Sequence, residues 1–185
     1  MSTGPTRSSA DRSGSPADVE HPGLATLLER DLELTELGDA LDQARQGRGQ
    51  VVLIEAAAGL GKTSLLRAGC QDAEATGFSC LRARATELER DFAYGCIRQL
   101  LEPLVARVSD SERDRLFEGA AALSKPLFAS TDLLQQALSA NSTFAIQHGL
   151  YWLLNNLADE GPVALAVDDV HWSDDESVRF LNYLD

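Results

Sequence analysis

The sequence predicts an α/β fold of three layers, in which helices cover both faces of a parallel sheet. Short continuous apolar runs at residues 51–54 and 163–167 are typical of strands buried on both faces. A loop of small residues and an amphipathic helix directly follow the first run. The 185 residues are 44% hydrophobic and 24% charged, which is enough apolar material for one globular domain.

The N-terminal part of the chain divides into a polar leader and a helix. Residues 1–22 are rich in Ser, Pro, Gly, Thr and Asp, so we expect a disordered leader, with the folded domain spanning residues 23–185. Apolar residues at helical spacing predict an amphipathic helix over about residues 31–45. Gln46 and Gly47 then interrupt the pattern and end the helix.

The middle of the chain predicts a strand–helix–strand unit and then a long helical region. The strand at residues 51–54 precedes a helix over about residues 62–75 and a second strand at residues 79–84. Residues 92–159 have helical periodicity throughout, so a helical insertion separates the second strand from the third, at residues 163–167. Residue types at helix starts predict these caps: Ser109 with Glu112, Asn141 or Ser142, and Ser173 with Glu176.

Charge and cysteine content exclude several classes of protein. The net charge of −13 argues against a bare nucleic-acid-binding surface, which needs a basic patch. No apolar run reaches the roughly 18 residues of a membrane helix, and the first residues lack the apolar core of a secretory signal. The three cysteines, Cys70, Cys80 and Cys96, are odd in number and lack C-x-x-C spacing, which favours buried reduced thiols in a cytoplasmic protein.

Residues 56–63 read Ala-Ala-Ala-Gly-Leu-Gly-Lys-Thr, which matches the phosphate-binding pattern G-x-x-x-x-G-K-[ST] except that Ala56 replaces the first glycine. Such a loop turns backbone N–H groups toward phosphate oxygens, and the following helix adds its positive N-terminus. Lys62 would reach the β- and γ-phosphates, and the Thr63 hydroxyl would be a ligand of Mg²⁺. The expected nucleotide-binding residues are Ala56, Ala57, Ala58, Gly59, Leu60, Gly61, Lys62, Thr63 and Ser64.

The Ala56 substitution has two interpretations. A Cβ at a position with positive φ costs about 1–2 kcal/mol. Phosphate loops with Ala at this position exist, so the backbone there need not require glycine. The alternative for the whole segment is an Ala/Gly turn between a strand and a helix, with an incidental lysine.

A second acidic site follows the apolar run at residues 163–167. Asp168 ends the predicted strand, where parallel sheets bind their ligands, and is expected to hold Mg²⁺. Asp169 could polarise an attacking water, so Lys62, Asp168 and Asp169 are the candidate catalytic residues. The alternative is that both carboxylates only begin a surface loop. His171 and Trp172 fit either a γ-phosphate sensor or a packed ring pair.

These segments together resemble the nucleotide-binding domain of the large ATP-binding regulators of the LuxR type, which belong to the STAND class of P-loop ATPases and are close to the AAA group. The resemblance is carried by residues 56–66 and, more specifically, by Val167-Asp168-Asp169-Val170-His171-Trp172-Ser173-Asp174. Residues 28–34, 89–95 and 98–104 also resemble family segments, although Glu29 stands where the family usually has Gly.

The resemblance implies a cytoplasmic domain that binds ATP or ADP with Mg²⁺, self-associates, and meets DNA only through a C-terminal helix-turn-helix region absent from residues 1–185. By resemblance, Arg30 would lie near the nucleotide; an exposed arginine at a helix start is the alternative. In this class a strand after Asp185 would lie between the strands at residues 51–54 and 163–167. We therefore expect a P-loop NTPase fold that is incomplete at its C-terminus, marginally stable and aggregation-prone.

Three functions remain open at this stage. The first is an ATP-binding signalling domain that hydrolyses ATP slowly, and only as part of the full-length domain. The second is a non-catalytic scaffold, gated by nucleotide, that recruits a protein partner. The third is a small-molecule kinase, although residues 92–159 offer no clear acceptor pocket or arginine-rich lid.

Overall fold

A computed structural model describes residues 30–129 and 143–184 of the chain. Three regions named above lie outside this part. They are the leader at residues 1–22, the first two residues of the family segment at 28–34, and the expected caps Asn141 and Ser142. In chain order the elements are α1 (Asp31–Arg45), α2 (Lys62–Ala75), β1 (Ser79–Arg84), η1 (Glu87–Glu89), α3 (Gly95–Arg107), α4 (Asp110–Leu116), η2 (Gly119–Phe128), α6 (Thr143–Ala158), β2 (Val163–Asp168), η3 (Val170–Trp172) and α7 (Asp175–Tyr183).

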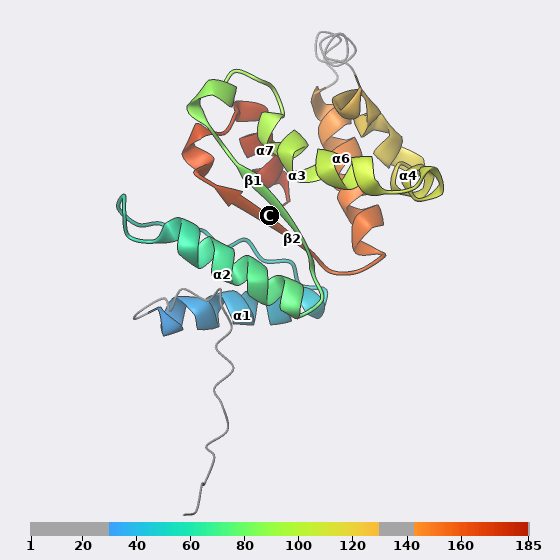
Figure 1. The fold of residues 1–185 in the computed structure, drawn as a ribbon. Coiled ribbons are helices and arrows are strands. Elements are labelled where there is room, and N and C mark those ends of the chain that lie inside the picture. Colours follow the sequence, from blue (N-terminus) through green and yellow to red (C-terminus); the bar gives the residue numbers. More distant parts are fainter. Residues whose placement is uncertain (1–29, 130–142, 185) are drawn as a thin grey trace, which may run out of the picture.

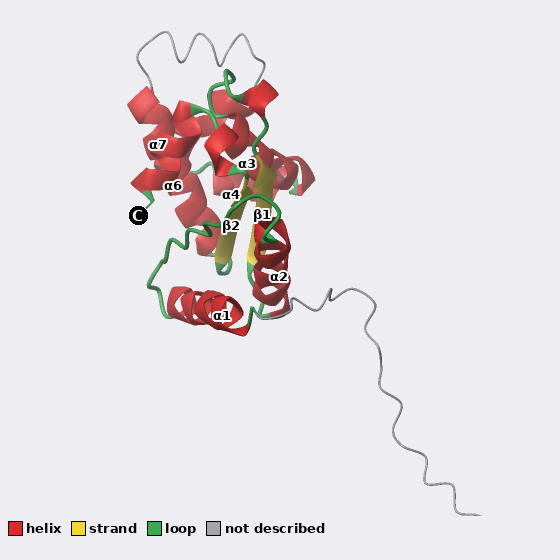
Figure 2. Ribbon diagram, turned by 90° about the vertical axis from the view of Figure 1, so that its left-hand side faces the viewer, coloured by secondary structure: helices red, strands yellow, loops and turns green. Residues whose placement is uncertain are grey.

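The two strands β1 and β2 form a parallel sheet at the centre of the molecule. Their register runs from Ser79 opposite Val163 to Arg84 opposite Asp168. Helices α1 and α2 lie on one side of this sheet, and α3, α6 and α7 lie on the other (Figures 1 and 2). The predicted α/β fold, with helices on both faces of a parallel sheet and a helical insertion between the strands, is therefore confirmed.

The predicted strand at residues 51–54 is the main error of the sequence analysis. No strand forms in this segment, which pairs with none of the strands in the described part of the chain. Val51 is 64% exposed and Leu53 is 69% exposed, so the apolar run is not buried on both faces. A cavity of about 170 Å³ lies between this segment, α1, α2 and the sheet. Apolar β-branched residues favour a strand, but a strand needs a hydrogen-bonding neighbour, and this segment has none among the described residues.

The hydrophobic core lies mainly between β1, α3, α6, α7 and η2. Its largest fully buried side chains include Tyr94, Ile97, Leu101, Leu150 and Phe180. Helix α6 packs tightly against η2 because Gly149 has no side chain: a Cβ built there would lie 2.5 Å from the Ser124 backbone nitrogen.

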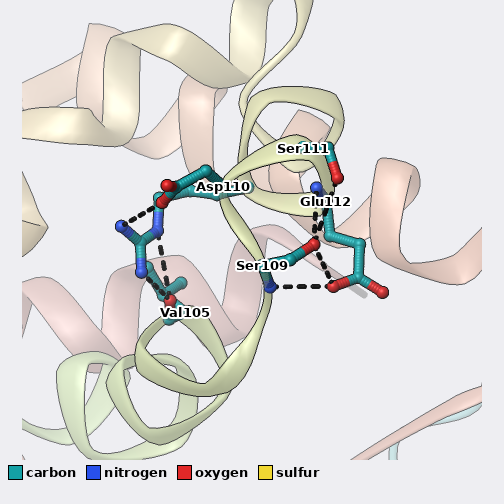
Figure 3. Close-up of polar contacts among 6 residues, drawn as sticks. Val105, Ser109, Asp110, Ser111 and Glu112 are labelled. Atoms are coloured by element: carbon teal, nitrogen blue, oxygen red, sulfur yellow. Dashed lines mark hydrogen bonds and ion pairs between the residues drawn. The ribbon is translucent and has the colours of Figure 1, made fainter.

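Two helix starts show how local sequence directs the fold. Ser109 caps α4 in the predicted capping box (Figure 3): its Oγ accepts from the Glu112 amide, and Glu112 Oε2 accepts from the Ser109 amide at 2.8 Å. Hydrogen bonds from Ser109 lower the pKa of Glu112. The capping box predicted at Ser173 and Glu176 is wrong. Helix α7 begins at Asp175, and the Asp174 side chain accepts from the Ser177 amide.

Among residues 30–129 and 143–184, no helix combines the length and apolar character needed to cross a bilayer.

Candidate functional site

The loop at residues 56–61 leads directly into α2, and two glycines shape it. Gly59 has φ +81° and Gly61 has φ +78°, the left-handed region that favours glycine. A Cβ at either position would meet no atom within 4 Å, so backbone conformation rather than crowding requires glycine there. Ala56 does not have a positive φ. Among the described residues other than glycine, only Tyr94 and Asp169 have one. The alanine at the first position of the motif is therefore unstrained.

Lys62 is the first residue of α2, and its side chain folds back over the loop. Its Nζ donates to the Ala56 carbonyl at 2.7 Å and to the Ala57 carbonyl at 3.2 Å. Helix α2 has no side-chain hydrogen bond at its N-cap and no acidic residue in its first turn. The unpaired amides of that turn, the helix dipole and the ammonium together make this end of α2 electropositive. Such a surface attracts an anion although the chain as a whole carries a charge of −13.

The loop meets the end of β2 through Thr63 and Asp168. Thr63 Oγ1 donates to Asp168 Oδ2 at 2.8 Å, and Asp168 Oδ1 accepts from the Asp169 amide at 3.0 Å. The structure thus brings together the two residues that the sequence analysis assigned to Mg²⁺. A hydroxyl and a carboxylate are hard oxygen donors of the kind that Mg²⁺ prefers. In the described part of the chain no cluster of three or more His, Cys, Asp or Glu could hold a metal, and Mg²⁺ sites of this kind complete their shell with water and phosphate oxygens.

Asp169 points to a different partner. Its backbone has φ +53°, an uncommon conformation for a residue with a side chain. Arg84 Nε donates to Asp169 Oδ2 at 3.2 Å, so the carboxylate forms an ion pair with the last residue of β1. Nothing in the local sequence assigns Arg84 to this site. Only the strand register, which places Arg84 opposite Asp168, shows that it belongs to this end of the sheet.

Arg30 lies on the other side of the loop. Its Nη2 donates to the Leu60 carbonyl at 2.9 Å, and its guanidinium forms an ion pair with Glu33. Arg30 also donates a hydrogen bond to the Glu33 carboxylate, and this bond lowers the pKa of Glu33. A cavity of about 150 Å³ lies between α1, residues 52–56 and the loop, and Arg30 and Lys62 both line it. Arg30 therefore lies beside the loop, and its proximity to a nucleotide stays a prediction.

The segment after β2 is attached to α3 by Asp174. This carboxylate is 2% exposed and accepts from the amides of Tyr94 at 2.7 Å, Cys96 at 3.3 Å and Ser177 at 2.9 Å. One side chain thus holds the N-termini of both α3 and α7. The contact with Ser177 is a local helix cap, but spacing gave no signal for the contacts with α3, because Tyr94 is 80 positions away and Cys96 is 78 positions away.

The described histidines and tryptophans contact one another through their rings. His171 is exposed and lies against Trp172, with ring centroids 5.0 Å apart at 47°. In α6, Trp152 Nε1 donates to His148 Nε2 at 3.1 Å. His171 and Trp172 therefore form a ring pair, one of the two interpretations left open by the sequence.

Comparison with known proteins gives one result. A family model described as AAA ATPase domain matches residues 26–184. The matched residues include the whole loop, Asp168, Asp169 and Asp174. No curated protein and no solved structure gives a significant match.

Proposed function

Because the chain belongs to the AAA ATPase domain family, we propose that it binds ATP and ADP, together with Mg²⁺, at residues 56–64. The observation that carries this proposal is the 2.8 Å hydrogen bond between Thr63 and Asp168. It places a hydroxyl and a carboxylate at the positive end of α2, where a phosphate and its cation need them.

In this proposal the residues in and around the loop have different roles. The amides at the start of α2 and the Lys62 ammonium hold the phosphates, while Gly59 and Gly61 provide the left-handed turns of the loop. Thr63 and Asp168 hold the cation. Bound Mg²⁺ neutralises charge on the phosphate oxygens. Arg30 fixes the loop from the α1 side through the Leu60 carbonyl.

The wider role follows from the segment around Asp168. We propose that the chain is the ATP-binding signalling domain of a LuxR-type transcriptional regulator of the STAND class, acting in the cytoplasm. The support is the resemblance of residues 167–174 to that family. In this role Asp169 orients the attacking water in a slow hydrolysis, the domain self-associates, and DNA is contacted by another region of the protein.

A specific contact also favours the second function, a nucleotide-gated scaffold without catalysis. The Asp169 carboxylate is already paired with Arg84. An Asp169 carboxylate that contacts the Arg84 guanidinium has that oxygen directed at a cation rather than at a water, which favours binding without turnover. ATP turnover by the full-length protein distinguishes the two functions, since only the first releases phosphate.

Calorimetric titration tests the common part of both functions. ATP and ADP, each with Mg²⁺ and with a chelator, are titrated into the chain and into Lys62→Ala. We expect saturable binding by the chain and at least tenfold weaker binding by the variant, because Lys62 supplies the charge nearest the phosphates.

The chain contains a matched control, since its only other lysine is Lys125. Lys125 lies over the Phe117 ring, 5.7 Å from its centroid, far from the loop. Lys125→Ala should bind nucleotide as the unchanged chain does. Equal binding by Lys62→Ala and Lys125→Ala, or no binding by a chain shown to be folded, would contradict the proposal.

A further inference from the structure

Two of the three cysteines meet between α2 and β1. Cys70 is on α2 and is 4% exposed, whereas Cys80 is on β1 and is partly exposed. Both cysteines line the cavity of about 170 Å³ between α1, α2 and the sheet, and their side chains are close enough to interact electrostatically. Cys96 lies on α3, on the other side of the sheet.

The connection from α2 to β1 holds the two thiols in place. Helix α2 ends at Ala75, and the chain turns through Gly77, where the Phe78 amide donates to the Ala73 carbonyl at 2.9 Å. The alternation of the strand places Cys80 and Arg82 on the same face, toward α2. Arg82 Nη2 donates to Glu74 Oε1 at 2.7 Å, which joins the strand to the helix beside the thiols.

The surroundings make the two thiols unequal. The neighbouring Cys70 thiol has the largest effect in lowering the pKa of Cys80. The Arg82 guanidinium lowers it further, whereas burial and Glu74 raise it. The neighbouring Cys80 thiol and burial raise the pKa of Cys70. The groups that line the cavity from α1 and β2 are uncharged. Of the two thiols, Cys80 is therefore the one that loses its proton more readily, and Cys70 is the one that keeps it.

We propose that Cys70 and Cys80 are a reversible oxidation site, in which a peroxide converts the two thiols into a disulfide that ties α2 to β1. The Cys80 thiolate attacks one peroxide oxygen, the O–O bond breaks, and the departing hydroxide takes up a proton to become water. Cys80 is then a sulfenic acid. The Cys70 sulfur attacks the Cys80 sulfur, the S–O bond breaks, and the departing hydroxide takes the Cys70 proton. The two thiols lose two electrons, and the peroxide is reduced to two waters.

This site goes beyond nucleotide binding and does not depend on it. Helix α2 begins at Lys62, so the disulfide would attach the helix that carries the phosphate loop covalently to the sheet. Reduction by a dithiol would release it. A disulfide of this kind suits a reducing compartment, where such bonds are transient and respond to oxidants.

Peptide mapping after hydrogen peroxide treatment tests the site. The folded chain is treated near neutral pH, catalase removes the peroxide, and free thiols are alkylated under denaturing conditions before non-reducing digestion and mass spectrometry. We expect a Cys70–Cys80 cross-link within one chain, a mass lower by two hydrogen atoms, alkylated Cys96, and full reversal by dithiothreitol. The rate should rise with pH as the Cys80 thiolate forms, at a lower pH than for an ordinary cysteine.

Single variants separate the roles of the two sulfurs. Cys70→Ala should leave a Cys80 sulfenic acid that dimedone traps, whereas Cys80→Ala should leave Cys70 unreacted at the same peroxide dose. Arg82→Gln should slow oxidation severalfold, because it removes the cation that stabilises the thiolate. Circular dichroism establishes that each variant is folded. Equal reaction of all three cysteines, a cross-link to Cys96, disulfides only between chains, or no loss of thiols would each overturn the proposal.

Discussion

Thr63 and Asp168 are 105 positions apart in the chain, yet Thr63 Oγ1 donates to Asp168 Oδ2 at 2.8 Å. This hydrogen bond joins the first turn of α2 to the last residue of β2. The two residues are far apart in the chain, so the packing of α2 against β2 decides whether the hydroxyl and the carboxylate meet.

The first prediction concerns the Mg²⁺ dependence of ATP binding. Asp168→Ala removes the carboxylate that we assign to the cation, so ATP affinity measured by calorimetry with Mg²⁺ should fall to the value measured with a chelator. Thr63→Ser is the matched control: it keeps the hydroxyl and should retain the Mg²⁺ dependence. An undiminished gain from Mg²⁺ in Asp168→Ala would remove Asp168 from the proposed site.

The second prediction concerns the buried carboxylate of Asp174. Asp174→Ala leaves the amides of Tyr94, Cys96 and Ser177 without their acceptor in a site that is 2% exposed. We expect the free energy of unfolding, measured by urea denaturation, to fall by about 2–4 kcal/mol. Asp175→Ala, at the next and exposed position, should cost well under 1 kcal/mol. Equal losses in the two variants would contradict the role of Asp174.

The third prediction concerns stability at alkaline pH. Tyr94 is fully buried, and desolvation raises its pKa to about 12, above its ordinary value near 10. The folded state therefore keeps the phenol proton over a range in which the unfolded state loses it, and stability falls as pH rises from about 10 to about 12. Tyr94→Phe has no phenol to ionise, so urea denaturation at several pH values should show a weaker fall for the variant. Identical slopes would show that Tyr94 does not titrate as described.

The fourth prediction concerns the packing of α6 on η2. A Cβ at Gly149 would lie 2.5 Å from the Ser124 nitrogen and 2.9 Å from the Leu123 carbonyl carbon, both backbone atoms that cannot move independently. Gly149→Ala should lower the free energy of unfolding by about 1–3 kcal/mol, as measured by urea denaturation. Gly38→Ala in α1 is the control, because its Cβ would meet nothing within 4 Å. That control should be neutral or stabilising by up to about 1 kcal/mol, and the reverse ranking would contradict the tight packing.

The fifth prediction concerns self-association. The unpaired segment at residues 51–54 exposes Val51, Val52 and Leu53 beside an apolar cavity. Such a segment can pair with another chain, so sedimentation velocity should show association that increases with concentration. Leu53→Lys should reduce the association by adding a charge to this segment, while Leu88→Lys, at an exposed position in η1, should not. A monodisperse monomer at every concentration would refute this expectation.

Much of the local structure could be predicted from spacing alone. The helices at Asp31–Arg45 and Lys62–Ala75 and the strands at Ser79–Arg84 and Val163–Asp168 lie where periodicity and apolar runs place them. The Ser109 capping box also forms as expected, because a cap depends on residues only a few positions apart. The apolar run at residues 51–54 shows the limit of such reasoning. Its composition favours a strand, but pairing depends on a neighbour that local sequence does not specify.

The sequence by itself determined the type and order of these elements and the phosphate-binding pattern at residues 56–63, because both depend on residues close together in the chain. Only the tertiary structure decided which distant groups meet: Thr63 with Asp168, Arg84 with Asp169, and Cys70 with Cys80. These contacts follow from strand register and from the packing of α2 on the sheet. Register and packing are settled by the summed burial of many side chains, so no single spacing in the sequence reveals them.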